Sequence, residues 1–196
     1  MRILILCGGR GLRLHPLTEH MPKSMVSIHG KPFLYYLFKR FKKHDLVLSV
    51  GYKKEVIENY CKDENFLVEY VKEDESLNTG GALYNAQEFF KNSRKFAVIN
   101  GDTILFDDFE KLAKKHKGIA SAVISGEMGT DKRNLAGIYF FSNKIFDYID
   151  NTIESIEQKL IKLSFKVNLI ETDEKYIDIG SFSKLNYAKR YLFKGE

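Results

Sequence analysis

Short apolar runs alternate along the chain with stretches in which hydrophobic residues recur every three or four positions. The first pattern is typical of strands buried on both faces, and the second is typical of amphipathic helices. The apolar runs predict strands at 2–6, 46–50, 66–71, 96–100, 120–125, 138–141, 165–169 and 175–179. The helical spacing predicts helices at 33–43, 54–62, 81–90, 109–116, 145–149, 153–163 and 182–192. This alternation predicts an α/β domain whose mostly parallel sheet is sandwiched by helices.

Length and composition fit one ordinary globular domain spanning residues 1–196. The chain has 44% hydrophobic and 29% charged residues, which is typical of a soluble protein. The apolar start is too short for a membrane span and lacks the features of a secretory signal, so we expect no membrane association and a cytoplasmic location. The two cysteines, Cys7 and Cys61, are too few for a disulfide framework and are expected to be small core residues.

The net charge of +5 raises the question of a nucleic-acid partner. The lysines, however, are spread along amphipathic segments such as 39–43 and 111–117, which favours solvated helix faces. No module that interleaves basic and aromatic residues is present, so nucleic acid is not an expected partner. The positive charge is better suited to attracting small anionic substrates.

A glycine-rich segment follows the first predicted strand. Gly8, Gly9 and Gly11 leave backbone amides that an anion can approach without a Cβ in the way. Arg13 and Lys23 add full positive charges nearby. The pattern favours a phosphate site, and a plain structural turn is the alternative.

Two familiar phosphate motifs do not fit this segment. The dinucleotide fingerprint would place its third glycine at Leu14, and Pro16 and Pro22 oppose an immediate helix after the turn. The P-loop pattern requires Gly-Lys-Ser/Thr at a fixed spacing, and this is absent. A long, basic loop that contains prolines is therefore expected after the first strand.

Two aspartates stand at the ends of predicted strands, where ligands of open α/β sheets bind. Asp102 follows the strand at 96–100, and Asp178 lies within the apolar run Ile177-Asp178-Ile179. A charge among such neighbours needs a partner, and two carboxylates beside a phosphate loop suit Mg²⁺. Taken singly, Asp102 could cap a turn and Asp178 could cap the following helix.

A second glycine turn, at 77–83, opens the helix predicted from Gly81. Its amides and the helix N-terminus could receive part of a nucleotide. Just before it lie Glu73, Asp74 and Glu75, and a carboxylate there could accept hydrogen bonds from the N1-H and N2-H groups of guanine. The alternative is that this acidic loop is simply solvated.

Taken together, these segments resemble the sugar-1-phosphate nucleotidyltransferases, also called nucleotide-sugar pyrophosphorylases, over nearly the whole chain. The resemblance rests on the glycine loop 8–18 with Pro22-Lys23, on Gly30-Lys31-Pro32, on Asn100-Gly101-Asp102 and on Asp178-Ile179-Gly180-Ser181. Within the family, Val50-Gly51-Tyr52-Lys53 and the segment 77–82 look most like the D-glycero-D-manno-heptose 1-phosphate guanylyltransferases.

The resemblance implies a single Rossmann-like nucleotidyltransferase domain. Such a domain would transfer a nucleoside monophosphate from an NTP, here GTP, to a sugar 1-phosphate, here D-glycero-D-manno-heptose 1-phosphate. It would release pyrophosphate, depend on Mg²⁺ and serve bacterial surface polysaccharide synthesis, and by analogy it could form a homodimer. The implied roles are catalysis for Arg13 and Lys23; nucleotide binding for Leu6, Gly8, Gly9, Gly11, Glu73, Gly80 and Gly81; sugar binding for Gly137 and Glu157; and metal binding for Asp102 and Asp178.

The chain also departs from the family pattern. Leu12 replaces a Thr or Ser whose hydroxyl could touch a phosphate, Ser24 replaces a common Pro, and Asn78 replaces a common Gly. The segment 125–133 is short where relatives carry a hairpin with a Glu-Lys-Pro motif, and Leu135 stands where many have a sugar-binding Asn. A uridylyltransferase for N-acetylmuramate 1-phosphate or another hexose 1-phosphate therefore remains open, as does a non-catalytic nucleotide-sugar binding module.

Overall fold

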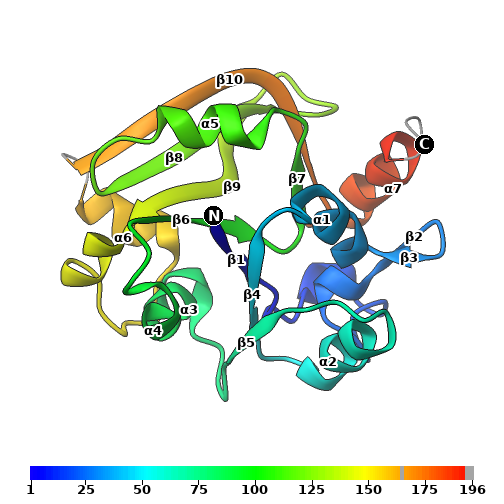
Figure 1. Cartoon of the computed structure of the whole chain (residues 1–196). Coiled ribbons are helices and arrows are strands. Elements are labelled where there is room, and N and C mark those ends of the chain that lie inside the picture. The colour runs from blue at the N-terminus through cyan, green and yellow to red at the C-terminus, as the bar shows by residue number, and fades with distance from the viewer. Residues whose placement is uncertain (164–165, 193–196) are drawn as a thin grey trace.

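One mixed sheet organises the protein, and its strands are not in sequence order (Figure 1). The computed structural model describes residues 1–163 and 166–192. The sheet order is β5 (Glu69–Lys72), β4 (Asp45–Val50), β1 (Arg2–Leu6), β6 (Lys95–Asn100), β9 (Arg133–Ser142), β8 (Ala120–Glu127), β10 (Val167–Asp178) and β7 (Thr103–Leu105). A separate hairpin pairs β2 (Ser27–Ile28) with β3 (Lys31–Pro32).

Strand directions place the ends of six strands at the same edge of the sheet. β1 runs parallel to β4 and β6, β4 runs parallel to β5, and β8 runs parallel to β10. β9 is antiparallel to β6 and β8, and β7 is antiparallel to β10. The loops that follow β1, β4, β5, β6, β8 and β10 therefore meet at one edge, where ligands of such sheets bind.

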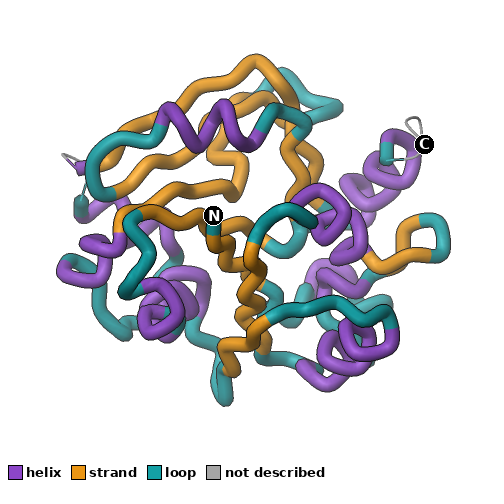
Figure 2. Tube along the Cα trace, in the orientation of Figure 1, coloured by secondary structure: helices purple, strands orange, loops and turns teal. Residues whose placement is uncertain are grey.

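Helices cover both faces of the sheet, as Figure 2 shows in purple against the orange strands. The helices packed on one face are α1 (Phe33–Phe41), α2 (Lys54–Asp63), α5 (Phe109–Lys115) and α7 (Phe182–Tyr191), and those on the other are α3 (Asn78–Asn85), α4 (Gln87–Phe90) and α6 (Ile156–Lys162). In β1, Ile3 and Ile5 join the first core and Leu4 joins the second, because successive side chains point to opposite faces. The predicted sandwich is confirmed.

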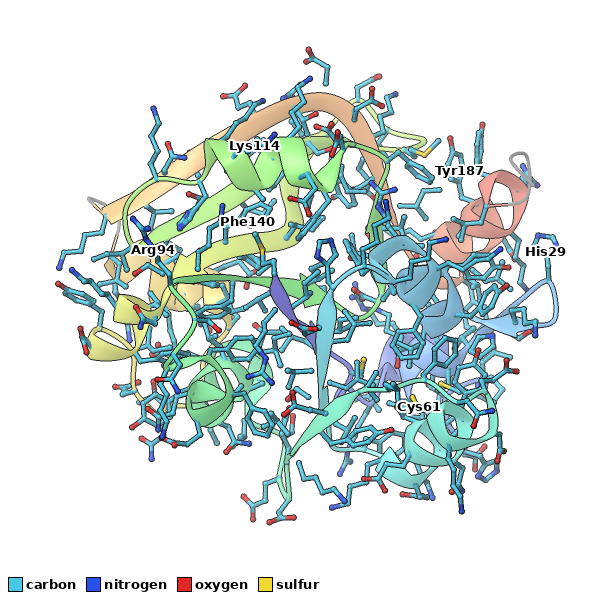
Figure 3. All side chains as sticks on the ribbon, viewed as in Figure 1. His29, Cys61, Arg94, Lys114, Phe140 and Tyr187 are labelled. Carbon is cyan, nitrogen blue, oxygen red and sulfur yellow. The ribbon has the colours of Figure 1, made fainter. Side chains whose placement is uncertain are left out.

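The helix α5 illustrates how its lysines are used. Phe109 on its inner side packs against Phe140 of β9, with ring centroids 5.4 Å apart. Figure 3 labels both Phe140 on β9 and Lys114 on α5; Phe140 is buried, whereas Lys114 is exposed. This segment therefore has the solvated basic face that its sequence predicts.

Several predicted boundaries change because tertiary contacts override local pattern. Phe66 lies outside β5 and packs against Phe38, with ring centroids 4.4 Å apart. The helix predicted at 81–90 begins at Asn78 and is split into α3 and α4 at Ala86. The helix predicted at 153–163 begins at Ile156, because a Ser155 capping box fixes its start.

The two strands predicted at 165–169 and 175–179 are one long strand, β10. Its pairing with β8 shifts register between Glu171 and Lys175, so a local irregularity takes the place of the expected loop. Phe165 lies outside the described residues. The short strands β2, β3 and β7 were not predicted, because two or three residues carry no periodicity.

The two cysteines lie in the core, as predicted. Cys7 and Cys61 are free and buried, and burial raises the pKa of the Cys7 thiol to about 12. Both thiols therefore stay protonated and behave as small apolar groups. Across residues 1–163 and 166–192, no helix is long and apolar enough to cross a membrane.

We expect Phe96→Ala to destabilise the protein by about 3–5 kcal/mol, because it leaves a cavity in the second core. Phe96 is fully buried and stacks on Phe90 with ring centroids 4.4 Å apart. Urea unfolding of the variant measures the change. Leu67→Ala is the control, since Leu67 is 98% exposed and its removal should change the free energy of unfolding by little.

Candidate functional site

A cleft of about 580 Å³ opens where the loops of the parallel strands converge. Its wall is formed by residues 6–13 after β1, by Lys23 and Ser24, by residues 100–102 after β6, and by Gly180 after β10. Glu73 and the first turn of α3 complete its lining. The glycine loop, Lys23, Glu73 and Asp102 therefore line one cavity, whereas Asp178, Gly137 and Glu157 are not among its lining residues.

The glycine loop is shaped by contacts with the basic segment that follows it. Gly11 has φ +66°, and a Cβ built on it would lie 2.9 Å from Cβ of Lys23. The Thr18 hydroxyl donates to the Gly11 carbonyl at 2.9 Å, which fixes the return of the loop. A side chain at Gly11 would thus be both strained and crowded. By contrast, a Cβ at Gly9 meets no atom within 4 Å, so the backbone there faces open space.

The departure at Leu12 is accommodated by the fold. Residues Leu12–Leu14 form a short 3₁₀ turn in which Leu14 is buried and Leu12 is 69% exposed. The leucine side chain at position 12 therefore fills no part of the core, and backbone amides and Arg13 are left as the polar groups of this turn.

Asp102 is held at the end of β6 by a close approach between backbones. The Gly101 amide donates to the Leu6 carbonyl at 3.0 Å, and a Cβ at Gly101 would lie only 2.5 Å from that oxygen. Only glycine fits there. The Asp102 Oδ2 atom pairs with Nζ of Lys23, and its Oδ1 accepts from the Thr103 hydroxyl at 3.0 Å.

Asp178 is brought beside Asp102 by the pairing of β10 with β7. In that ladder Asp178 lies opposite Thr103, and the Ile179 amide donates to the Asp102 carbonyl at 3.0 Å. The Asp178 Oδ1 atom accepts from the Gly180 amide at 2.7 Å. The interpretation of Asp178 as the cap of the last helix is wrong, because the Ser181 side chain caps α7.

The basic and acidic groups converge at Gly180. A Cβ built on this glycine would lie 2.7 Å from Asp178 Oδ1, 3.2 Å from Nη2 of Arg13 and 3.4 Å from Nζ of Lys23. Arg13, Lys23, Asp102 and Asp178 therefore surround one point. In the described part of the chain no group of three or more His, Cys, Asp or Glu side chains is gathered for a metal, so a cation here would rely on the two aspartates.

Glu73 lines the cleft beside the glycine loop, since a Cβ on Gly8 would lie 3.0 Å from its Oε1 atom, and it is 8% exposed. Its Oε1 accepts from the Ser49 hydroxyl at 2.5 Å and its Oε2 accepts from the Leu77 amide at 3.4 Å. Burial raises the pKa of the Glu73 carboxyl, and these two hydrogen bonds oppose the rise. Of the three acidic residues in this loop, Glu73 lines the cleft, while the side chain of Asp74 is almost fully exposed.

The glycines at the start of α3 do not line the cleft. The Gly80 amide donates to the Glu154 carbonyl at 2.8 Å, and a Cβ there would lie 2.7 Å from Cε of Lys159. A Cβ on Gly81 would likewise meet the Thr152 carbonyl at 3.4 Å. These two glycines let α3 pack against the segment before α6. The cleft is lined from this turn by Asn78, Thr79 and Ala82.

Two of the departures from the family pattern have a structural explanation. Asn78 has φ +58°, a left-handed conformation that asparagine tolerates better than most residues, so it can stand in for the family's glycine. The segment 125–133 still forms a hairpin, in which the Glu127 amide donates to the Lys132 carbonyl at 3.0 Å and Gly129 has φ +82°. The shortened segment therefore keeps a tight turn between β8 and β9.

The residues predicted to bind sugar lie on the β9 and α6 side. Gly137 has φ +65°, and a Cβ there would lie 2.5 Å from the Asn100 side-chain nitrogen. Asn100 lines the cleft, and its Oδ1 is buried without a hydrogen-bond partner. Glu157 accepts a hydrogen bond from the Tyr139 hydroxyl, whose pKa is raised by burial and by Glu157.

Sequence analysis missed Lys184 and Glu127. Lys184 Nζ lies 2.5 Å from Asp178 Oδ2 and 2.7 Å from Glu127 Oε1. Glu127 could have been found from the sequence, because it stands at the end of β8 just as Asp102 stands after β6. Lys184 carries no such signal in the sequence, because a lysine on a helix is ordinarily solvated.

The chain is similar to known proteins in both sequence and fold. The sequence pattern described as "Nucleotidyl transferase" matches residues 2–134. A D-glycero-alpha-D-manno-heptose 1-phosphate guanylyltransferase from Campylobacter jejuni is 37% identical over 211 residues, covering 92% of this chain and 95% of that protein. The Bifunctional protein GlmU of Methanococcus maripaludis is 33% identical over 215 residues, and the chain spans about half of its length.

A solved structure is similar over almost the whole fold. HddC from Yersinia pseudotuberculosis, complexed with GMP-PN, superposes with a TM-score of 0.83 at 28% identity, covering 97% of this chain and 99% of that one. The chain belongs to the nucleotidyl transferase family.

We expect the Glu73 carboxyl to make stability depend on pH with a defined sign. The pKa of Glu73 is higher in the folded protein than the ordinary value of 4.5, so the folded state binds this proton more tightly than the unfolded chain does. The resulting contribution to the free energy of unfolding is present below pH 4.5 and is lost as the pH rises. Relative to Glu73→Gln, the wild type should therefore lose free energy of unfolding as the pH is raised from about 4.5 toward neutrality. Urea titrations across this range measure the difference. An unchanged or opposite trend would contradict the effect, and Glu75→Gln is the exposed control.

Proposed function

We propose that this protein transfers a nucleoside monophosphate from an NTP to a sugar 1-phosphate and releases pyrophosphate. The observation that carries the proposal is the meeting of Arg13, Lys23 and two strand-end aspartates around Gly180, at the end of a glycine-lined cleft. The family assignment and the names of the relatives support it. The preferred pair is GTP and D-glycero-D-manno-heptose 1-phosphate, in keeping with the 37% identical relative and with the GMP-PN complex of HddC.

The reaction would need no protein nucleophile. A phosphate oxygen of the sugar 1-phosphate attacks the α-phosphorus in line, a new P–O bond forms, and the bond to the β-phosphate oxygen breaks as pyrophosphate leaves with its electron pair. The protein's task is to align the two anions and to neutralise charge. The amides of Gly8, Gly9 and Gly11 with Arg13 would hold the triphosphate, and Lys23 would lie between the α-phosphate and the incoming phosphate.

The donor set at Asp102 and Asp178 fits Mg²⁺, which binds few carboxylates and completes its shell with water and phosphate oxygens. When bound, the ion would supply charge neutralisation at the phosphates. The Asp178 ladder contact with Thr103 and the pairing of Lys23 with Asp102 would orient the ligands for it.

For base recognition, we propose that the Glu73 carboxylate accepts hydrogen bonds from guanine and that residues of α3 lie beside the base. For the sugar, we propose contacts at Gly137, which lies against Asn100 of the cleft wall, and at Glu157. Gly80 and Gly81 would contribute by shaping this wall. The second candidate is a uridylyltransferase that acts on N-acetylmuramate 1-phosphate or another hexose 1-phosphate. The similarity to GlmU supports considering a sugar other than heptose. Assembly as a homodimer is a further proposal by analogy.

The direct test incubates the protein with each common NTP, Mg²⁺ and a panel of sugar 1-phosphates, and measures pyrophosphate. We expect release with GTP and heptose 1-phosphate, and only when both are present. Preference for UTP with a hexose 1-phosphate would favour the second candidate. Nucleotide binding without pyrophosphate across the whole panel would contradict catalysis and favour a non-catalytic binding module.

Asp102→Asn and Asp178→Asn should each lower kcat by on the order of 10²-fold or more, because each removes one anionic ligand of the proposed ion. Circular dichroism should show an unchanged fold. Asp74→Asn serves as the matched control, since this aspartate in the neighbouring loop is almost fully exposed. Near-normal turnover of either site variant would overturn the metal assignment.

Glu73→Gln should lower kcat/KM for GTP about 10-fold more than kcat/KM for UTP. A carboxylate can accept hydrogen bonds from two guanine N–H groups, and an amide cannot. The measurement is the ratio of kcat/KM for the two nucleotides. Glu75→Gln, at an exposed position in the same loop, should leave the ratio unchanged. Equal losses for GTP and UTP would show that Glu73 does not distinguish the bases.

A further inference from the structure

Lys184 joins two carboxylates that come from different strands. Its ammonium group lies 2.7 Å from Glu127 Oε1, at the end of β8, and 2.5 Å from Asp178 Oδ2, at the end of β10. Glu127 is 8% exposed and also lies 3.5 Å from the Tyr176 hydroxyl, so it is held in place rather than solvated. The three charges form a row in which the lysine separates two negative groups.

The lysine reaches Asp178 from the side opposite the nucleotide cleft. Glu127, Asp178 and Lys184 line a smaller cavity of about 210 Å³, whereas Arg13 and Lys23 line the main cleft. The other Asp178 oxygen, Oδ1, faces the Gly180 amide on the side of Arg13 and Lys23. The two oxygens of this carboxylate therefore have different neighbours: Oδ2 faces Lys184, and Oδ1 faces the Gly180 amide.

Asp102 has the same kind of partner, because its Oδ2 pairs with Lys23. Each of the two aspartates proposed to hold a cation thus carries a lysine in the nucleotide-free protein. Lys23 lies in the cleft, where phosphates can attract it away. Lys184 lies outside the cleft, with Glu127 as a second anchor, so an incoming nucleotide does not compete for it.

We propose that Lys184 is a positioning residue that closes Oδ2 of Asp178 to divalent cations and leaves Oδ1 as the oxygen available on the substrate side. This proposal rests on the proposed function of Asp178. Without the lysine, Oε1 of Glu127 and Oδ2 of Asp178 would lose the cation that lies between them, and two such partly buried carboxylate oxygens attract hard cations. Groups behind a ligand commonly control its orientation in this way.

The experiment measures Mn²⁺ binding to the nucleotide-free protein by electron paramagnetic resonance. Lys184→Met should bind Mn²⁺ about 10-fold more tightly than the wild type. Lys184→Arg, which keeps the charge, should behave like the wild type, and the double variant Lys184→Met/Glu127→Gln should lose the gain. Lys189→Met is the matched control, because Lys189 is an exposed lysine on the same helix.

A Lys184→Met protein that binds Mn²⁺ no better than the wild type would overturn the proposal, as would an equal gain in Lys184→Arg. If Lys184→Met does not fold, Lys184→Gln tests the same loss of charge with a polar side chain and the same expected gain. The wild-type pyrophosphate assay is run alongside. Absence of turnover there contradicts the proposed function, while the Mn²⁺ comparison still decides the role of Lys184.

A kinetic comparison separates positioning from a purely structural role. With Mg²⁺ present, Lys184→Met should lower kcat about 10-fold and leave KM for the nucleotide within about twofold, since the triphosphate contacts are untouched. Lys184→Arg should restore most of kcat. A variant that loses thermal stability but keeps kcat would show that the lysine only ties α7 to the sheet.

Discussion

The antiparallel pairing of β7 with the end of β10 is the constraint on which the candidate site depends. Asp102 precedes β7 and Asp178 ends β10, so their proximity follows from three ladder pairs and from the contact between the Ile179 amide and the Asp102 carbonyl. The same end of the sheet carries the glycine loop, because β1 lies beside β6 and Gly101 touches the Leu6 carbonyl. Asp102 and Asp178, which are 76 positions apart in sequence, are thereby held together by backbone contacts rather than by flexible side chains.

Charge is balanced within the site before any substrate arrives. Lys23 offsets Asp102, and Lys184 is shared by Asp178 and Glu127. Such pairs lower the cost of keeping carboxylates partly buried at the bottom of a cleft. In the proposed function, a triphosphate entering this region would meet cations that are already positioned, since Arg13 and Lys23 line the cleft. Preorganisation of this kind is what a reaction without a protein nucleophile requires.

Local sequence was sufficient for the features that depend on local chemistry. The glycine loop, the basic residues after it and the two aspartates were all predicted, because strand ends and glycine turns are visible in a short window. The long bent β10 was predicted as two strands, since its irregular segment between Glu171 and Lys175 reads as a break. The packing of Gly80 against Glu154 and the ion pair of Lys184 with Glu127 each join residues more than 50 positions apart, and no single window contains that information.

The two edges of the sheet also affect how copies of this protein can associate. β7 has three residues and β5 has four, and on β5 the charged Glu69 and Lys72 pair with Arg2 and Glu58. Short edges with charged side chains offer few free backbone groups to a neighbouring strand. Growth of the sheet through β5 or β7 is therefore disfavoured. A dimer built from helices and loops instead would leave the strand order and the cleft it supports unchanged.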